Sequence, residues 1–233
     1  MFISFEGIDG SGKSTQARLL AEALRAEGRE VVLTREPGGS DGAEAIRRLL
    51  VEGGAERWSA ETEILLFNAA RRDHLERTIR PALDAGQTVI TDRFADSTRV
   101  YQGATRGDLS AAVETLHSLM IGIEPDRTFV IDIDPAEGLE RATRRQAAAL
   151  AGATAAAAIS GDIRGVAGIS AAAAGLAAPG SGGEDRFESL GLPFQEVLRA
   201  GFHRLAAEHP ARLRLIDGSG SPEQVAARVR AAL

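Results

Sequence analysis

Eight residues near the N-terminus follow the pattern G-x-x-x-x-G-K-[ST], and they constrain the fold more than any other feature of the chain. The segment is Gly7-Ile8-Asp9-Gly10-Ser11-Gly12-Lys13-Ser14. An apolar run at residues 2–6 precedes it, and residues 14–26 follow with apolar side chains at helical spacing. The pattern therefore lies between a predicted strand and a predicted helix, which is the context in which it forms a phosphate-binding loop, or P-loop.

Each part of this loop has the chemistry needed to hold a nucleoside triphosphate. Glycines let backbone N–H groups surround phosphate oxygens, and the following helix adds the positive end of its dipole. We expect Lys13 to reach the β- and γ-phosphates and Ser14 to be a ligand of Mg²⁺. A chance glycine-rich turn would not explain Lys13, the only lysine among 27 basic residues. The residues predicted to bind ATP are Gly7, Ile8, Asp9, Gly10, Ser11, Gly12, Lys13, Ser14 and Thr15.

Hydrophobic periodicity in the rest of the chain alternates between strands and helices. Further strands are predicted at residues 31–34, 88–91, 128–133 and 212–216, the first of them buried. Helices are predicted at residues 14–26, 41–52, 60–83, 109–121, 135–145, 193–208 and 222–232, with Pro81 bending or interrupting the third. This alternation predicts one domain over residues 1–233, a three-layer α/β/α sandwich with parallel strands and ligands at their carboxyl ends.

Composition excludes several classes of function. A net charge of −6 and a pI near 5.4 argue against a protein that coats nucleic acid or an anionic membrane, because such binding needs a basic surface. The chain has no cysteine, so disulfide and thiolate chemistry are excluded. Residues 1–5 lead directly into the motif without a basic region or a long apolar stretch. We expect a cytoplasmic protein that binds small nucleotides.

Residues 147–182 interrupt the alternation of elements. They are mostly alanine and glycine, and Asp162 and Arg164 are the only charged residues among them. Alanine runs favour marginal helices but offer little side-chain surface for a core. The sequence therefore predicts an inserted segment that is flexible or weakly packed at the surface, and leaves its origin and effect open.

Two further groups of residues suggest a site for a phosphate acceptor. Asp92 and Arg93 follow the strand at 88–91, where a carboxylate can hold hydrated Mg²⁺ and a guanidinium can span two phosphates. Phe67 and Arg71 are four residues apart on a predicted helix, so a ring and a guanidinium can address one base together. The alternatives are a surface ion pair for the first group and a core ring beside a solvated arginine for the second.

A P-loop alone does not distinguish kinases from GTPases or motors, which share the phosphate cradle. A guanine-specific Asn-Lys-x-Asp motif is excluded because Lys13 is the only lysine, and no large second domain of the kind a motor needs is predicted. A kinase is therefore favoured.

In their order along the chain, these motifs resemble those of thymidylate kinase. The matching segments are Gly7 to Thr15, Arg35-Glu36-Pro37-Gly38-Gly39, Phe67 to Arg71, Asp92-Arg93-Phe94 with Ser97, Thr98 and Tyr101-Gln102-Gly103, and Asp185-Arg186-Phe187-Glu188. The resemblance covers everything except the alanine- and glycine-rich segment. It implies a P-loop kinase of the nucleoside monophosphate kinase type with a five-stranded parallel sheet. It also implies a homodimer that makes dTDP from dTMP and MgATP for DNA precursor supply.

The same resemblance implies how dTMP is bound. Phe67 is similar to the ring that stacks on thymine, Arg71 to the group at its edge, and Asp9 to the carboxylate facing the sugar 3′-hydroxyl. The residues implied in dTMP binding are Asp9, Arg47, Phe67, Arg71, Arg93, Ser97, Thr98, Tyr101 and Gln102. Arg47 and Arg93 would hold the acceptor phosphate. Tyr101 has the alternative of being a packed helix residue, and Asp92 would join Ser14 as a metal ligand through water.

Members of the family differ in the source of the arginine that neutralises the transferred phosphate. Some carry it within the P-loop, but Gly10 stands at that position here. The resemblance therefore implies arginines from a lid at about residues 141–188, and the residues implied in catalysis are Lys13, Arg93, Arg145 and Arg186. The insertion at about 147–182 separates the last two, which leaves lid closure open, and a solvated basic helix end is the alternative for both.

Two other functions are compatible with these motifs. One is a kinase for another nucleoside monophosphate or for a deoxynucleoside, and the other is a nucleotide-binding homologue that has lost transfer. Whether Asp9, Phe67 and Arg71 surround one pocket distinguishes the first from a dTMP kinase. In the second, Arg47, Phe67 and Arg93 would have no reason to converge. The residues that contact adenine are not determined by the sequence, although the turn at Asp217-Gly218-Ser219 is a candidate.

Overall fold

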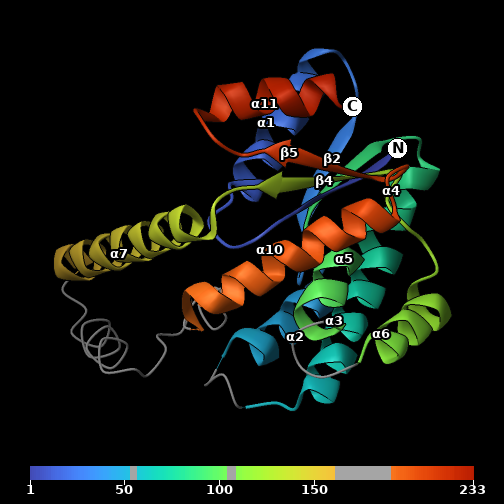
Figure 1. Cartoon of the computed structure of the whole chain (residues 1–233), viewed down its shortest axis with the longest axis horizontal. Coiled ribbons are helices and arrows are strands. Elements are labelled where there is room, and N and C mark those ends of the chain that lie inside the picture. Colours follow the sequence, from blue (N-terminus) through green and yellow to red (C-terminus); the bar gives the residue numbers. More distant parts are fainter. Residues whose placement is uncertain (53–56, 104–108, 161–189) are drawn as a thin grey trace.

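In the computed structural model, which describes residues 1–52, 57–103, 109–160 and 190–233, five strands form one sheet. The strands are β1 (Phe2–Glu6), β2 (Val31–Arg35), β3 (Thr88–Asp92), β4 (Arg127–Asp132) and β5 (Leu213–Asp217). Their spatial order is β2-β3-β1-β4-β5, and every neighbouring pair is parallel. The five-stranded parallel sheet is thus confirmed, and all carboxyl ends of its strands lie at the same edge (Figure 1).

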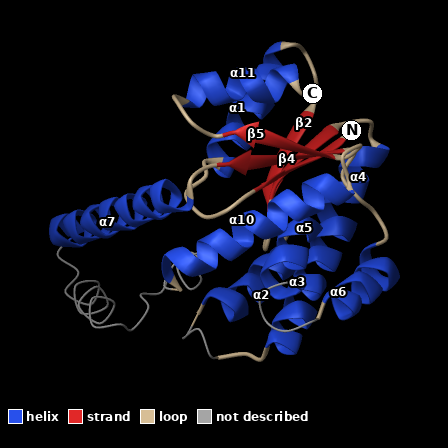
Figure 2. Ribbon diagram, viewed as in Figure 1, coloured by secondary structure: helices blue, strands red, loops and turns tan. Residues whose placement is uncertain are grey.

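Helices cover both faces of this sheet, as Figure 2 shows. The helices α1 (Lys13–Ala26) and α11 (Pro222–Ala231) lie together on one face. The other face carries α10 (Gly191–Glu208) and the helices α2 (Asp41–Val51), α3 (Ala60–His74), α4 (Arg80–Asp84), α5 (Ala95–Thr98) and α6 (Ser110–Leu116). This arrangement confirms the three-layer sandwich.

Side chains of β1 alternate between the two layers of core. Ile3 and Phe5 pack with α1 and α11, whereas Phe2 packs with the helical segment before β3. Ser4 and Glu6 point to the same face as Phe2, and both are completely buried. The central strand therefore directs a carboxylate into the layer that contains α5.

The prediction that the second strand is buried was wrong. β2 lies at the edge of the sheet and pairs only with β3, so its residues are partly exposed, including Leu33 at 36 %. A run of valine and leucine has the same pattern in an edge strand and in a central one, because position in the sheet is a tertiary property.

Two helical regions differ from the sequence prediction. The helix predicted at 60–83 comprises α3, a π-helical segment at Leu75–Ile79 and α4, and Pro81 lies just after the π-helical segment gives way to α4. Residues 95–103 form α5 and a π-helical segment at Arg99–Gly103, although no helix was predicted there. Most of their side chains are buried whatever their polarity, so no amphipathic pattern marks this helix.

The helix predicted at 135–145 is longer than expected. In the structure, α7 (Pro135–Ser160) continues into the alanine-rich segment, because alanine has the highest helix propensity. It projects away from the sheet (Figure 1). The rest of the predicted insertion, at 161–182, and the predicted lid residue Arg186 lie outside the described residues.

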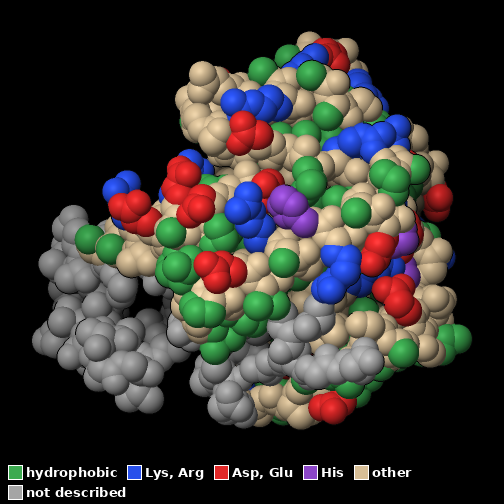
Figure 3. Space-filling model, viewed as in Figure 1, with side chains coloured by type: hydrophobic (Ala, Val, Ile, Leu, Met, Phe, Trp, Pro, Cys, Tyr) green, Lys and Arg blue, Asp and Glu red, His purple; other side chains and the backbone are tan. Residues whose placement is uncertain are grey.

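The surface has charges of both signs interspersed on the face drawn in Figure 3. On α7, for example, Arg144 donates to Glu140 at 2.6 Å and Arg141 donates to Glu137. A further helical segment of π type, at His117–Ile121, completes the second face. No helix within the described ranges has the length and apolar character to cross a bilayer.

Candidate active site

The P-loop connects the carboxyl end of β1 to the start of α1, as the sequence predicts. Gly10 and Gly12 have positive φ values of 72° and 95°, a backbone conformation that glycine adopts without strain. Lys13 is buried, and its Nζ donates to the backbone oxygen of Ile8 at 2.8 Å. The lysine side chain therefore folds back over the P-loop and is fixed to the backbone of that loop.

A cavity beside this loop brings together three distant parts of the chain. The P-loop residues, α7 and the turn after β5 all contribute to it. Its lining residues are Gly10, Ser11, Gly12, Lys13, Ser14, Thr15, Gln16, Arg141, Arg145, Gly218, Gly220, Pro222 and Val225. Arg145 thus lies at the same cavity as Lys13, together with Arg141 one helical turn earlier. The predicted turn at Asp217 to Ser219 contributes Gly218.

Ser14 and Asp92 meet between α1 and β3. The Ser14 hydroxyl donates to one carboxylate oxygen of Asp92, and the other oxygen, Oδ1, is buried without a hydrogen-bond partner in the described part of the chain. No cluster of three or more metal-ligating side chains occurs among the described residues. This donor set fits Mg²⁺, which keeps several waters and binds to one or two protein oxygens and substrate phosphates.

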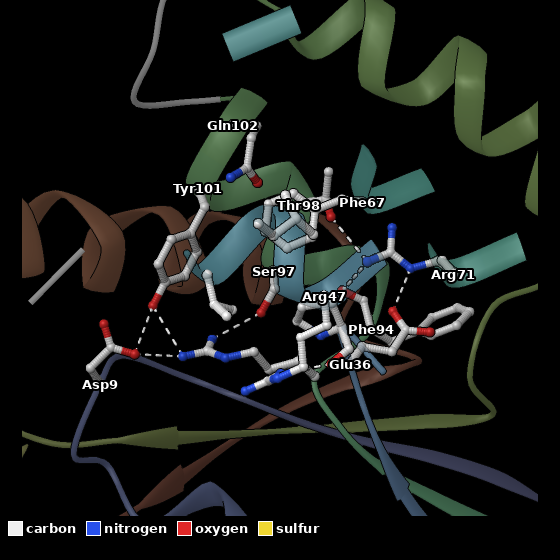
Figure 4. Close-up of a pocket in the computed structure, with 14 residues that line it drawn as sticks. Asp9, Glu36, Arg47, Phe67, Arg71, Phe94, Ser97, Thr98, Tyr101 and Gln102 are labelled. Carbon is white, nitrogen blue, oxygen red and sulfur yellow. Dashed lines mark hydrogen bonds and ion pairs between the residues drawn. The ribbon is translucent and has the colours of Figure 1, made fainter. Parts of the chain in front are cut away.

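A second cavity contains every residue that the sequence predicted for acceptor binding (Figure 4). These are Asp9, Arg47, Phe67, Arg71, Arg93, Ser97, Thr98, Tyr101 and Gln102, and the cavity is completed by Glu36, Pro37, Leu50, Val51 and Phe94. Asp9 lines this cavity while the next residue, Gly10, lines the first, so the two cavities meet at the P-loop. Asp9, Phe67 and Arg71 therefore surround one pocket.

Arg71 is held by three protein groups. Its Nε donates to Glu36 Oε2 at 2.7 Å, and its Nη2 donates to the Phe94 backbone oxygen at 3.1 Å and to Thr98 Oγ1 at 3.0 Å. Glu36 also contacts His74, whose Nδ1 lies 3.0 Å from Glu36 Oε1. Nη1 of Arg71 has no partner among the described residues, and the guanidinium is presented to the pocket (Figure 4).

Sequence reasoning assigned no role to Glu36, which anchors Arg71 in this pocket. The sequence does contain a signal for a site residue here, because Glu36 stands beside Pro37 and two glycines in a segment that follows β2. A carboxylate at the carboxyl end of a parallel strand is a candidate site residue. The apolar wall formed by Leu50 and Val51 had no such signal, since the end of α2 has an ordinary amphipathic pattern.

Arg93 forms the centre of a second buried network. Its Nη2 donates to Asp9 Oδ1 at 2.6 Å and to the Tyr101 hydroxyl at 3.2 Å, and its Nη1 donates to Ser97 Oγ at 3.0 Å. Arg93 has a φ of 70°, a conformation that few residues other than glycine adopt and that occurs mainly at functional sites. The surface-pair alternative for Arg93 is thus wrong, because the residue is only 8 % exposed.

Gln195 links α10 to the P-loop and was not predicted. Its Nε2 donates to Asp9 Oδ2 at 3.2 Å, and its Oε1 accepts the backbone N–H of Asp9 at 3.4 Å. The two residues are 186 positions apart, and Gln195 is completely buried. A single glutamine on an amphipathic helix gives no sequence signal for such a contact.

Comparisons with known proteins agree with this geometry. Residues 5–154 match the family model described as thymidylate kinase. The chain is 59 % identical over 231 residues to a thymidylate kinase of Dinoroseobacter shibae, covering 99 % of this chain and 95 % of that protein. It is 56 % identical over 229 residues to a thymidylate kinase of Ruegeria pomeroyi, covering 98 % and 92 %.

A solved structure is similar over the same length. The crystal structure of thymidylate kinase from Ehrlichia chaffeensis superposes with a TM-score of 0.68 at 33 % identity, covering 100 % of this chain and 97 % of that one. The family match spans more than half of the residues of this chain. The chain belongs to the thymidylate kinase family.

Proposed function

We propose that this protein transfers the γ-phosphoryl group of MgATP to dTMP, giving dTDP and ADP. The observation that carries the proposal is one pocket lined by Asp9, Phe67 and Arg71 that meets a P-loop cavity at Asp9. A scaffold that had lost acceptor binding would have no reason to bury these charged groups together, because taking charges out of water costs free energy even when they are paired. The family of the chain supports the same acceptor.

Two donors without partners in the described part of the chain are placed to recognise the base. Arg71 Nη1 points to the pocket, and Gln102 Nε2 is buried with no hydrogen-bond partner among the described residues. Both are hydrogen-bond donors, so they fit the carbonyl oxygens of thymine better than the exocyclic amino group of cytosine. Phe67 lines the same pocket and supplies a ring for stacking. Thr98 holds Arg71 in place.

The sugar and the acceptor phosphate lie along the Arg93 network. Asp9 accepts from Arg93 and Tyr101 and faces the 3′-hydroxyl of the deoxyribose. Arg93 and Arg47 line one pocket, where two guanidinium groups neutralise the 5′-phosphate. Arg47 is oriented by a 2.7 Å hydrogen bond from its Nη1 to the Pro37 oxygen. In this arrangement an oxygen of the dTMP 5′-phosphate, which accepts the phosphoryl group, is directed to the P-loop cavity.

Positioning and charge neutralisation promote transfer, because the transferred phosphoryl group needs little covalent help. Lys13 donates to the β- and γ-phosphates, while Ser14 and, through water, Asp92 would hold Mg²⁺, which neutralises phosphate charge when bound. Arg145 adds a cation from α7. An added Cβ at Gly10 would lie 2.0 Å from the Gly138 oxygen, so a P-loop arginine has no room, which supports the lid-arginine type. Arg186 stays a prediction.

A panel of acceptors tests this function. With MgATP and a coupled assay of ADP release, we expect turnover with dTMP, weaker turnover with dUMP, and kcat/KM lower by about 100-fold or more with dCMP, because the amino group of cytosine would face a protein donor where thymine has a carbonyl oxygen. Arg71→Met, which keeps much of the side chain's length without its donors, should reduce this preference. A higher kcat/KM for dCMP, dGMP or AMP than for dTMP would overturn the assignment.

The protein is also proposed to be a homodimer that associates through α3 and the segment His117–Ile121. Leu65, Leu119 and Met120 are 57 %, 71 % and 48 % exposed, respectively. Arg72, two helical turns after Leu65, donates to the Met120 oxygen at 2.7 Å, so these two segments lie side by side. An isologous interface covers the same apolar surface on both copies. A single domain over residues 1–233, a lid at about 141–188 and a cytoplasmic location stay predictions.

Substitution of Leu119 tests this surface. Leu119→Glu should convert a dimer to a monomer in sedimentation experiments at micromolar concentration, because two carboxylates would be buried without partners. Val197→Glu on α10 is the matched control, since Val197 is 50 % exposed and lies on another helix. A wild-type protein that sediments as a monomer, or dissociation by the control substitution alone, would refute the proposed surface.

A further inference from the structure

Glu6 is a buried carboxylate that the proposed reaction leaves without a role. It is the last residue of β1, directly before the P-loop, and its side chain is completely buried. It lines neither of the two cavities. Its three hydrogen bonds all come from the segment after β3 rather than from its own loop.

These contacts fix the start of the helix that carries the acceptor-binding residues. Glu6 Oε1 accepts the backbone N–H groups of Phe94 at 2.8 Å and Ser97 at 3.3 Å. Phe94 is the N-cap of α5 and provides no capping side chain of its own. A carboxylate from another strand therefore satisfies N–H groups that this short helix cannot satisfy internally.

The other carboxylate oxygen acts through Ser97. The Ser97 hydroxyl donates to Glu6 Oε2 at 2.5 Å and accepts from Arg93 Nη1 at 3.0 Å. Because its single proton goes to Glu6, the lone pairs of this hydroxyl are directed to the guanidinium. Arg93 in turn donates to Asp9. A continuous chain of hydrogen bonds thus runs from Glu6 to the pocket.

We propose that Glu6 is a positioning residue for the acceptor site, which in its ionised form orients Ser97 and through it holds Arg93 in the geometry that binds the dTMP phosphate. This inference rests on the proposed function. It assigns Glu6 no contact with substrate, so its effect should appear in dTMP binding rather than in ATP binding. A purely structural role would instead change stability and leave dTMP affinity unchanged.

The charges around Glu6 determine when it is ionised. Asp96 of α5 is the nearest like charge, and it is paired with Arg212 at 2.6 Å and Arg99 at 2.8 Å. Arg93 is the cation on the opposite side, with Asp9 beyond it. Burial, followed by the Asp96 carboxylate, raises the pKa of Glu6 to about 7, although the Ser97 hydrogen bond, Arg93 and the Phe94 N–H oppose this rise.

Glu6→Gln separates positioning from capping. An amide oxygen in place of Oε1 still accepts the two backbone N–H groups, so the cap is kept. The amide nitrogen, however, donates to Ser97, as a protonated carboxyl also does, and this competes with Arg93 for the hydroxyl lone pairs. The substitution therefore imitates protonated Glu6 at every pH.

Glu6→Gln should weaken dTMP binding but should not lower the stability of the fold. The pKa of Glu6 is about 7 in the folded protein and ordinarily 4.5, so the stability that Glu6 contributes is fully present below pH 4.5 and is lost as pH rises through 7. Glu6→Gln removes this loss of stability at high pH, because the amide does not ionise. The variant should be at least as stable as the wild type at pH 8, while binding dTMP more weakly, a combination that a structural role does not give.

The experiment measures binding of dTMP by titration calorimetry, with KM for dTMP and ATP and the melting temperature measured in parallel. At pH 8 we expect Glu6→Gln to weaken dTMP binding about tenfold and to leave KM for ATP within about twofold, as for a lost charge-assisted contact. The ratio of wild-type to variant affinity should fall towards one at pH 6. Titration of the substrate phosphate cancels in this ratio.

Ser4→Ala is the matched control. Ser4 lies two residues earlier on the same face of β1 and is also completely buried, but its hydroxyl contacts Thr128 at 2.7 Å. It should lower the melting temperature without changing dTMP affinity. Equal dTMP affinity of the wild type and Glu6→Gln at pH 8 would overturn the inference, whereas absence of dTMP binding in the wild type would overturn the proposed function itself.

Discussion

Lys13→Ala is expected to lower kcat for dTMP phosphorylation by about 1,000-fold, while the affinity for dTMP changes by less than about threefold. Lys13 is buried at the P-loop, and its Nζ lies 2.8 Å from the Ile8 oxygen. It lines the triphosphate cavity and not the acceptor pocket. Under the proposed function its charge acts on the phosphoryl group being transferred, where no other lysine can replace it.

Single-turnover kinetics with MgATP and calorimetric titration with dTMP measure these two effects separately. Arg18→Ala is the matched control, because Arg18 lies on the same helix as Lys13 but forms an exposed pair with Glu22 at 2.8 Å. It should leave both quantities unchanged, since exposed pairs of this kind contribute little. A Lys13→Ala variant that keeps more than about a tenth of wild-type kcat would show that the P-loop lysine does not stabilise transfer here.

Arg93→Ala is expected to have the second large effect, a decrease in kcat/KM for dTMP of about 1,000-fold. The side chain joins Asp9, Ser97 and Tyr101, and it is one of three arginines that line the acceptor pocket. Its removal takes away a cation for the acceptor phosphate. It also leaves the buried Asp9 carboxylate without its 2.6 Å ion pair, which should cost about 3–5 kcal/mol of unfolding free energy.

A double variant separates these two consequences. Asp9→Asn in the Arg93→Ala background removes the unpaired charge, so unfolding in urea should recover much of the lost stability. The kcat/KM for dTMP should stay low, because neither the cation nor the Asp9 carboxylate is restored. If catalysis recovered together with stability, the role of Arg93 would be to neutralise Asp9 and not to bind the phosphate.

Much of the molecule could be predicted from the sequence because its signals are local. The P-loop pattern, the apolar runs and the helical spacing each lie within one or two elements, and they led to the correct fold class and to a parallel sheet. The nine residues implied in dTMP binding all line one cavity. Each follows the carboxyl end of a strand or lies on a helix beside that edge, where ligands bind in parallel sheets.

The wrong predictions of secondary structure and burial concern properties that the local sequence pattern does not contain. β2 is an edge strand although its residues have the pattern of a buried one, and the helical residues 95–103 are buried without amphipathic spacing. The alanine-rich segment was separated from the helix before it, yet α7 continues to Ser160. In each case the outcome depends on neighbouring elements or on continued propagation of a helix, rather than on the period of the residues themselves.

The sequence by itself determined the fold class and the phosphate-binding loop, because these depend on patterns within short segments, and its family resemblance identified nine residues that line one cavity. Only the tertiary structure decided how those residues are held. Glu36 orients Arg71 across 35 positions, Gln195 reaches Asp9 across 186, and Glu6 holds Ser97 across 91. The physical reason is that a buried polar group must find partners with correct geometry, and packing of distant elements determines which partners lie within hydrogen-bond distance.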